Sequence, residues 1–190
     1  MRGQSAGAAL FICLLVGACE DQQDLGLAHV ELVIDAFYSF DPVPLRASLE
    51  GVDGAGAIMY YQAWAEAANY AIQTRRPCSR ADATSIVCAI TVTDDFGQTM
   101  GYMATDTFTL TMQDNRISAI AFAGDDPPIF DALLGWMAAN QPQVMNGPCK
   151  DSFTGGSTPA QCARAVVAAA KVFVSLDEAS RGVMPTAPQP

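Results

Sequence analysis

Residues 99–123 read TMGYMATDTFTLTMQDNRISAIAFA, and this stretch decides the fold. Between residues 99 and 112, threonines alternate with larger side chains, which is the period-two pattern of a strand with one face in a core. Asp114 and Asn115 tolerate positive φ angles and predict a tight turn. Residues 116–123 predict a second strand, so we expect an antiparallel hairpin. One face of the long strand is expected to carry Met100, Tyr102, Ala104, Asp106, Phe108, Leu110 and Met112.

The residues on either side of this hairpin predict one more strand and a set of helices. Residues 85–93 alternate and are rich in β-branched side chains, so they predict a strand that completes a three-stranded meander, with a turn over residues 94–98. Helices are predicted, mostly from apolar residues at helical spacing, over residues 27–40, 42–49, 57–73, 128–140 and 159–174. Asp41 followed by Pro42 is typical of a helix start. The predicted fold class is therefore α+β.

Length and charge limit the class of protein. The chain has 190 residues, which suits one ordinary domain. Asp and Glu together number 20 and Lys and Arg together number 10, for a net charge of −10. Nucleic acids and anionic lipid headgroups are bound by basic patches, so we expect no nucleic-acid partner.

The N-terminal residues are typical of an export signal. Arg2 precedes the apolar run 8–16, which is too short to span a bilayer, since that takes about 20 residues. The sequence Leu15-Val16-Gly17-Ala18-Cys19 looks like the lipobox of bacterial lipoproteins, which implies cleavage of a signal peptide, residues 1–18, and a lipid (palmitate among its acyl chains) on Cys19. Residues 19–26 would then tether the protein to the membrane at the extracytoplasmic side of the cell envelope. The alternative is ordinary cleavage near Ala18 and release of a secreted protein.

The remaining cysteines agree with export. Apart from Cys13 and Cys19, the chain contains Cys78, Cys88, Cys149 and Cys162. Four cysteines allow three pairings, and the spacing favours Cys78–Cys88 and Cys149–Cys162 because both close short loops. A four-cysteine zinc site is the alternative, but the chain has no C-x-x-C pair and export favours disulfides. We therefore expect two disulfides and no metal or other cofactor.

The order of elements resembles a known superfamily. Helix, short helix, helix and antiparallel meander, together with the pair Asp-Thr-Phe-Thr-Leu (106–110) and Arg-Ile-Ser-Ala-Ile (116–120), is similar to nuclear transport factor 2-like domains. That group includes the SnoaL-like polyketide cyclases and the ketosteroid isomerases. The resemblance covers residues 27–145 and implies a cone-like curved sheet packed on N-terminal helices. A loop and C-terminal helix, residues 146–176, and a disordered tail, residues 177–190, would complete the chain.

The resemblance also implies a cavity for a small hydrophobic molecule. We expect its lining to include Tyr61, Trp64, Tyr102 and Phe108, although aromatic residues at helical spacing are also typical of a plain core. Asp106 lies between apolar neighbours, so burial would raise the pKa of its carboxyl. In ketosteroid isomerases an aspartate in a similar Asp-x-Phe context donates a hydrogen bond to the substrate oxyanion, which makes Asp106 the candidate catalytic residue. The alternative is that Asp106 bonds a backbone amide or a tyrosine hydroxyl, or meets water at the sheet edge.

Two functions follow from this reading. The first is an exported, membrane-tethered domain that binds a small apolar ligand or an envelope protein without catalysis, and a homodimer through the outer sheet face stays open. The second is an isomerase or cyclase acting on a hydrophobic carbonyl compound, with Asp106 as proton donor. No general base is evident in the sequence, and the pairs Asp94-Asp95 and Asp125-Asp126 are interpreted as solvated turns.

Overall fold

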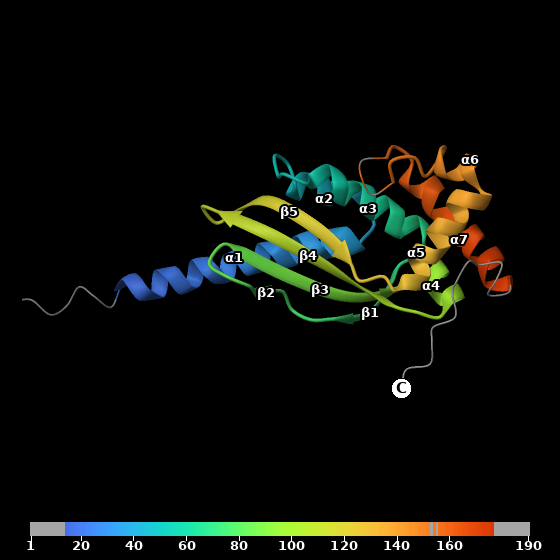
Figure 1. Ribbon diagram of the computed structural model, residues 1–190. Helices are drawn as coiled ribbons and strands as arrows, with labels where there is room; N and C mark the ends of the chain where they lie inside the picture. The colour runs from blue at the N-terminus through green and yellow to red at the C-terminus, as the bar shows by residue number, and fades with distance from the viewer. Residues whose placement is uncertain (1–13, 153, 155, 177–190) are drawn as a thin grey trace, which may run out of the picture.

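The computed structural model describes residues 14–152, 154 and 156–176, with side chains from residue 25 onward. Within this part the protein is α+β, as expected, with helices packed on a curved, unclosed antiparallel sheet (Figure 1). The helices are α1 (Leu14–Tyr38), α2 (Pro42–Ser48), α3 (Ala55–Ala67), α4 (Asp95–Met100), α5 (Pro128–Asn140), α6 (Pro142–Met145) and α7 (Pro159–Ser175). The strands are β1 (Ala71–Arg75), β2 (Ser79–Arg80), β3 (Ser85–Thr93), β4 (Ala104–Gln113) and β5 (Arg116–Gly124).

The sheet is built around the predicted hairpin of β4 and β5. Its strand order is β1-β3-β4-β5, and the short β2 also pairs with β3. Asp114 and Asn115 turn the chain between β4 and β5 with φ angles of 50° and 61°, as expected for these residue types. Every second residue of β4 from Asp106 to Met112 is buried, so the alternation does place one face of this strand in a core.

Two clusters of buried residues fill the interior. The first, which we call the sheet core, joins α1, α2 and α3 to the inner face of the sheet. Its largest side chains include Ile34, Phe37, Leu45, Leu49, Ile58, Ile86, Ile90, Phe108 and Leu110. The second, the helical core, joins the other side of α3 to α4, α5 and α7. Its members include Trp64, Phe96, Phe130, Leu133, Met137, Val166 and Phe173.

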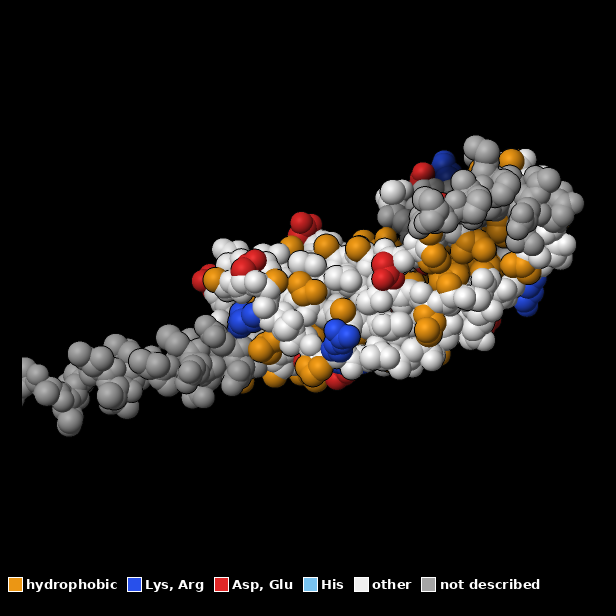
Figure 2. Space-filling model, turned by 60° about the horizontal axis from the view of Figure 1, so that its bottom comes forward, with side chains coloured by type: hydrophobic (Ala, Val, Ile, Leu, Met, Phe, Trp, Pro, Cys, Tyr) orange, Lys and Arg blue, Asp and Glu red, His pale blue; other side chains and the backbone are white. Residues whose placement is uncertain are grey.

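The helical core lies at one end of the sheet, where α4, α5, α6 and α7 gather (Figure 1). On the face shown in Figure 2, hydrophobic side chains gather towards this end, and charged side chains are few and scattered. The segment predicted as a separate C-terminal part therefore packs on the same helix, α3, that covers the sheet.

The helix predicted over residues 57–73 is wrong at its end. It stops at Ala67, and Asn69 takes a φ angle of 57°, which the α-helix does not allow. Residues 71–75 then form β1, which pairs with β3 from Ala71 opposite Thr93 to Arg75 opposite Ile90. The helical periodicity around Ile72 was outweighed by hydrogen bonding to the free edge of β3, a contact distant in the sequence.

The start of the long strand and the turn before it are also corrected. Residues 95–100 form α4, and Asp94 caps it by accepting a hydrogen bond from the Gly97 amide at 2.5 Å. Gly101 ends the helix with a φ angle of 81°, so β4 begins only at Ala104. Met100 and Tyr102 therefore pack with the helical core instead of extending the strand face. A further strand that the sequence did not predict, β2, pairs with residues 86–87 of β3.

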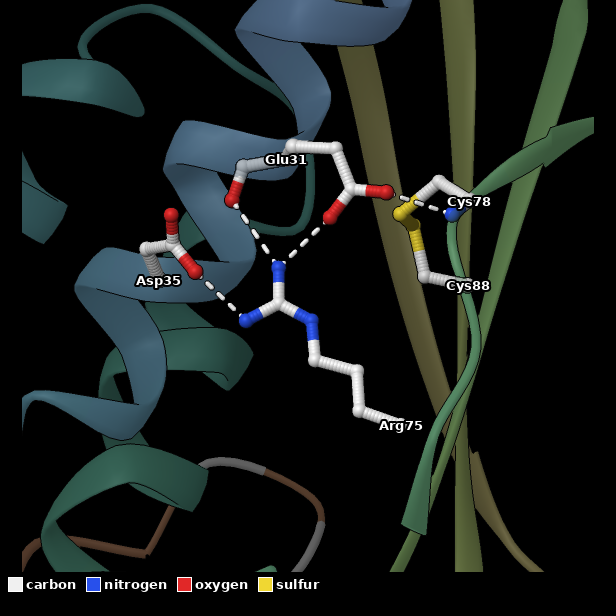
Figure 3. The surroundings of a disulfide bond; sticks show 5 residues. All are labelled: Glu31, Asp35, Arg75, Cys78 and Cys88. Carbon is white, nitrogen blue, oxygen red and sulfur yellow. Dashed lines mark hydrogen bonds and ion pairs between the residues drawn. A yellow bond between two sulfur atoms is a disulfide. The ribbon is translucent and has the colours of Figure 1, made fainter.

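Both disulfides favoured by loop length are present. Cys78–Cys88 joins the residue before β2 to β3, and Cys149–Cys162 joins the loop after α6 to α7. Beside the first of them, Arg75 forms ion pairs with Glu31 and Asp35 of α1, and Glu31 also accepts a hydrogen bond from the Cys78 amide (Figure 3). These contacts tie the edge of the sheet to α1.

The predicted N-terminal and C-terminal segments are only partly described. Residues 1–13 of the predicted signal peptide and residues 177–190 of the predicted tail lie outside the described residues. Residues 14–26 form the first half of α1, so the helix predicted to begin at residue 27 begins earlier and includes the backbone of the predicted tether. The Cys19 side chain lies outside the described part. Within the described residues, no helix is both long and apolar enough to cross a membrane.

Candidate functional site

A pocket of about 420 Å³ lies where the two cores meet. Tyr61 and Phe122 pack against the sheet core, whereas Trp64, Phe96 and Phe130 belong to the helical core. The aromatic residues of the lining are Tyr61, Trp64, Tyr70, Phe96, Phe122 and Phe130. Ala104, Asp106, Gly124, Asp126, Asp131 and Leu134 complete it.

Contacts between the aromatic rings hold the walls in place. The ring centroids of Tyr61 and Phe122 are 4.2 Å apart, which joins α3 to β5. Phe96 of α4 stacks on Phe130 of α5 at 5.4 Å and contacts Trp64 edge-on at 6.4 Å. Since each wall is part of a packed cluster, the pocket is preformed in the absence of a ligand.

Asp106 is the buried polar group of the pocket. Its residue is only 2% exposed, and the Tyr38 hydroxyl of α1 donates a hydrogen bond of 2.6 Å to its Oδ2. No hydrogen bond to Oδ1 is present among the described residues, so this oxygen is available to a ligand in the pocket. The structure thus joins two of the predicted possibilities, because Asp106 bonds a tyrosine and also lines a cavity.

Burial controls the charge of Asp106. Desolvation raises the pKa of its carboxyl to about 7, the Tyr38 hydrogen bond opposes this shift, and the negative charges of Asp126 and Asp125 add to it. The same burial, together with the neighbouring Asp106, raises the pKa of the Tyr38 hydroxyl far above its ordinary value. Tyr38 therefore stays a hydrogen-bond donor, and Asp106 changes charge near neutral pH.

A second carboxyl, Asp126, lies close to Asp106. Gly124 is the register partner of Asp106 across the hairpin, and a side chain on Gly124 would come within 3.0 Å of Asp126 Oδ2. Asp125, which lies between Gly124 and Asp126, accepts a hydrogen bond from the Thr105 amide. This bond holds the loop after β5 against the start of β4. Burial raises the pKa of Asp126, and the Tyr102 hydroxyl donates a hydrogen bond of 3.3 Å to its Oδ1.

Asp94 adds to the negative charge around the pocket without lining it. It is 5% exposed and caps α4, and burial raises the pKa of its carboxyl to about 7 against the effect of the Gly97 amide. Asp126 and Asp106 contribute to the same shift. The cap of α4 and the pocket are therefore coupled electrostatically.

Of the four residues predicted to bind a ligand, two line the pocket and two do not. Tyr61 and Trp64 line the pocket, as does Asp106. Phe108 is fully buried in the sheet core against Phe37, at 4.9 Å between ring centroids, and Tyr102 reaches the pocket only through its hydrogen bond to Asp126.

Sequence reasoning missed four of the six aromatic lining residues, Tyr70, Phe96, Phe122 and Phe130, and both of the less buried lining acids, Asp126 and Asp131. Tyr70 and Phe122 had no pattern to distinguish them from core or surface residues. Asp125 and Asp126 were interpreted as a solvated turn, and Asp126 is indeed exposed as a residue, yet its carboxyl lines the pocket. Their position directly after β5, at the end of the sheet where Asp106 lies, was the one signal that could have found them.

A second hollow, of about 490 Å³, lies between α2 and α3. Val43, Arg46, Ala47, Glu50 and Gly56 of its lining are exposed, and it contains no buried titratable group. We therefore regard the smaller pocket, with its buried carboxyl, as the candidate site.

Within the described residues, no group of three or more His, Cys, Asp or Glu side chains is placed to hold a metal ion. Comparison with protein-family models, with curated proteins and with solved structures finds no match to this chain.

Proposed function

We propose that this protein is an exported domain that binds a small molecule with an apolar body in the pocket between the two cores. The observation that carries the proposal is the preformed pocket of about 420 Å³, walled by aromatic side chains and containing one buried carboxyl with a free oxygen. Small-molecule sites are typically concave and apolar, with a few polar groups that orient the ligand. The resemblance to SnoaL-like domains supports the same proposal, and the cavity favours a small ligand over a protein partner.

The disulfides indicate the compartment. Cys78–Cys88 and Cys149–Cys162 indicate an oxidising, extracytoplasmic location. We propose in addition that Cys19 carries a lipid, on the strength of the lipobox-like sequence before it.

The lipid proposal is tested by detergent partition of the full chain expressed in a bacterium. We expect the protein in the detergent phase of a Triton X-114 extract, and the Cys19→Ser variant in the aqueous phase. Recovery of the unaltered protein in the aqueous phase would mean that the signal is cleaved without lipidation.

Ligand binding is tested with Nile red, an uncharged apolar dye whose emission rises in apolar surroundings. We expect saturable binding, and a loss of about tenfold or more in affinity when Leu134→Trp fills the pocket. Val43→Trp is the matched control, because Val43 is 68% exposed and lines the other hollow. Equal affinity of Leu134→Trp and the unaltered protein would place the dye elsewhere and contradict the proposal.

Catalysis on a hydrophobic carbonyl compound is a second candidate, favoured by the geometry of Asp106 and Asp126. A protonated Asp106 could donate from Oδ1 to a carbonyl oxygen while Asp126, as the base, removes a proton from the carbon beside it. The test follows deuterium uptake by a β,γ-unsaturated cyclic ketone in D₂O. We expect Asp106→Asn and Asp126→Asn to slow it by about 100-fold or more and Glu66→Gln, on the exposed side of α3, to leave it unchanged. Uptake no faster than in buffer would exclude this candidate.

A further inference from the structure

We propose that the pocket selects ligands that carry a protonated amine, so that the molecule bound is an organic cation with an apolar body. This inference rests on the proposed function and adds the charge of the ligand to it. It depends on three features of the pocket, which are its uncompensated acids, the free oxygen of Asp106 and the aromatic walls.

The acids of the pocket have no cationic partner among the described residues. Asp106, Asp126 and Asp131 line it, and its lining contains no Lys, Arg or His. The ion pairs of the described part both belong to Arg75, which is engaged with Glu31 and Asp35 of α1 (Figure 3). An anionic ligand would be repelled by these carboxyls, whereas a cationic ligand would be attracted and would offset part of their charge.

Asp106 supplies the specific contact. Its carboxyl is almost fully buried, Oδ2 is held by Tyr38, and Oδ1 is left without a donor at the pocket wall. A buried carboxylate oxygen without a donor is costly, and a charged donor such as an ammonium group provides the strongest hydrogen bond to it. Tyr38 fixes the orientation of the carboxyl, so it acts as a positioning residue for this contact.

The aromatic walls suit the rest of such a ligand. Trp64, Tyr61 and Phe122 present ring surfaces within the same pocket. Aromatic faces attract ammonium groups and also bury an apolar body. One pocket therefore offers both parts of an amphiphilic amine a partner.

The ionisation of Asp106 makes binding depend on pH. The groups that influence its charge are Tyr38 of α1 and Asp125 and Asp126 after β5, and the charge of Asp106 in turn raises the pKa of Asp94 before α4 and of Tyr70 before β1. The pKa of Asp106 is raised to about 7 in the free protein, so a cation binds with release of a proton below this pH. Affinity for an amine should rise as the pH rises through 7, whereas affinity for a carbonyl acceptor should fall.

The test compares three ligands that share one apolar body, measured by calorimetry with the full folded domain. They are 2-(1-naphthyl)ethylamine, 2-(1-naphthyl)ethanol and 1-naphthylacetate, which are a cation, a neutral molecule and an anion at pH 8. We expect the amine to bind about tenfold or more tighter than the alcohol, the acetate to bind weakest, and the preference for the amine to decrease below pH 6.

Matched variants assign this preference to the acids of the pocket. Asp106→Asn should reduce the preference for the amine over the alcohol to about threefold or less while it leaves the affinity for the alcohol almost unchanged. Asp126→Asn should have a smaller effect in the same direction, and Glu66→Gln, which removes one exposed charge from α3, should have none. Because the readout is a ratio of two ligands on one protein, a general loss of stability does not imitate the result.

The outcomes separate this inference from the proposed function. If the alcohol binds as tightly as the amine, or if Nile red binds and the amine does not, the pocket binds apolar molecules without selecting a cation. If neither the dye nor any of the three naphthyl compounds binds, the proposed function fails and the inference fails with it.

Discussion

The two cores of this protein are built by different means, and the difference explains where the pocket lies. The sheet core is formed by strands whose alternating residues face α1, with large side chains such as Phe37, Phe108 and Leu110 in close contact. The helical core depends on small residues of α7, among them Ala163, Ala169 and Ala170, which let helices approach closely. Aromatic residues from both cores meet at their boundary without filling it, and the pocket remains there.

The helix α3 belongs to both cores. Ile58 and Ala65 lie in the sheet core, and Tyr60, Trp64 and Ala68 lie in the helical core. We therefore expect the cores to unfold together, although they are built differently. The following predictions test or sharpen this comparison, from the largest expected effect to the smallest.

Phe108→Ala should have the largest effect, because Phe108 is fully buried and contacts Phe37 and Phe122 at 4.9 and 5.1 Å. We expect a loss of about 3 to 5 kcal/mol in the free energy of unfolding, measured by urea denaturation. The fluorescence of Trp64 and Trp136, in or beside the helical core, should change in the same single transition as circular dichroism. Two separate transitions would show that the cores fold independently.

Asp106→Asn should change how stability depends on pH. The folded protein keeps a proton on Asp106 up to about pH 7, whereas the unfolded chain loses it near pH 4, so the unaltered protein loses stability as the pH rises between these values. Each pKa unit corresponds to about 1.4 kcal/mol, so the variant should gain up to about 4 kcal/mol relative to the unaltered protein between pH 4 and pH 8.

Urea denaturation at several pH values measures this difference. Asp94 shifts stability in the same direction and should leave part of the pH dependence in the Asp106→Asn variant. The Glu66→Gln variant is the control for the loss of an exposed acid. A stability difference that does not change with pH would mean that Asp106 titrates at an ordinary pKa.

Removal of either disulfide should cost less than Phe108→Ala. Cys78–Cys88 and Cys149–Cys162 close loops with sequence separations of 10 and 13, for which the chain-entropy contribution is about 3 kcal/mol each. We expect the two double Cys→Ser variants to lose similar amounts in urea denaturation, one bond belonging to each core. A far larger loss from one of them would identify the core that depends on its cross-link.

Arg75→Gln should have the smallest effect. Its ion pairs with Glu31 and Asp35 join β1 to α1 at a partly exposed edge of the sheet, so they should contribute about 1 kcal/mol or less at low salt. The difference from the unaltered protein should decrease when salt is added, because exposed charges are screened. A loss that is independent of salt would point to packing of the Arg75 stem instead.

The sequence by itself determined the features that depend on neighbouring residues. The alternation in residues 104–113, the Asp114-Asn115 turn, the strand 85–93 and the Asp41 cap of α2 were all predictable, because each follows from local backbone preferences and side-chain period. Both disulfides followed from loop length. The apolar neighbours of Asp106 in the alternating strand also indicated that its side chain is buried.

Only the tertiary structure decided where α3 stops and what surrounds Asp106. Residues 71–75 are a strand because the edge of β3 is there to pair with them, and residues 95–100 are a helix that packs on α7. Asp126 reaches the pocket because Asp125 holds its loop to β4, and Phe122 reaches it because its ring packs against that of Tyr61. These contacts join residues far apart in the chain, and their free energy outweighs local propensity, which is why side-chain periodicity did not predict them.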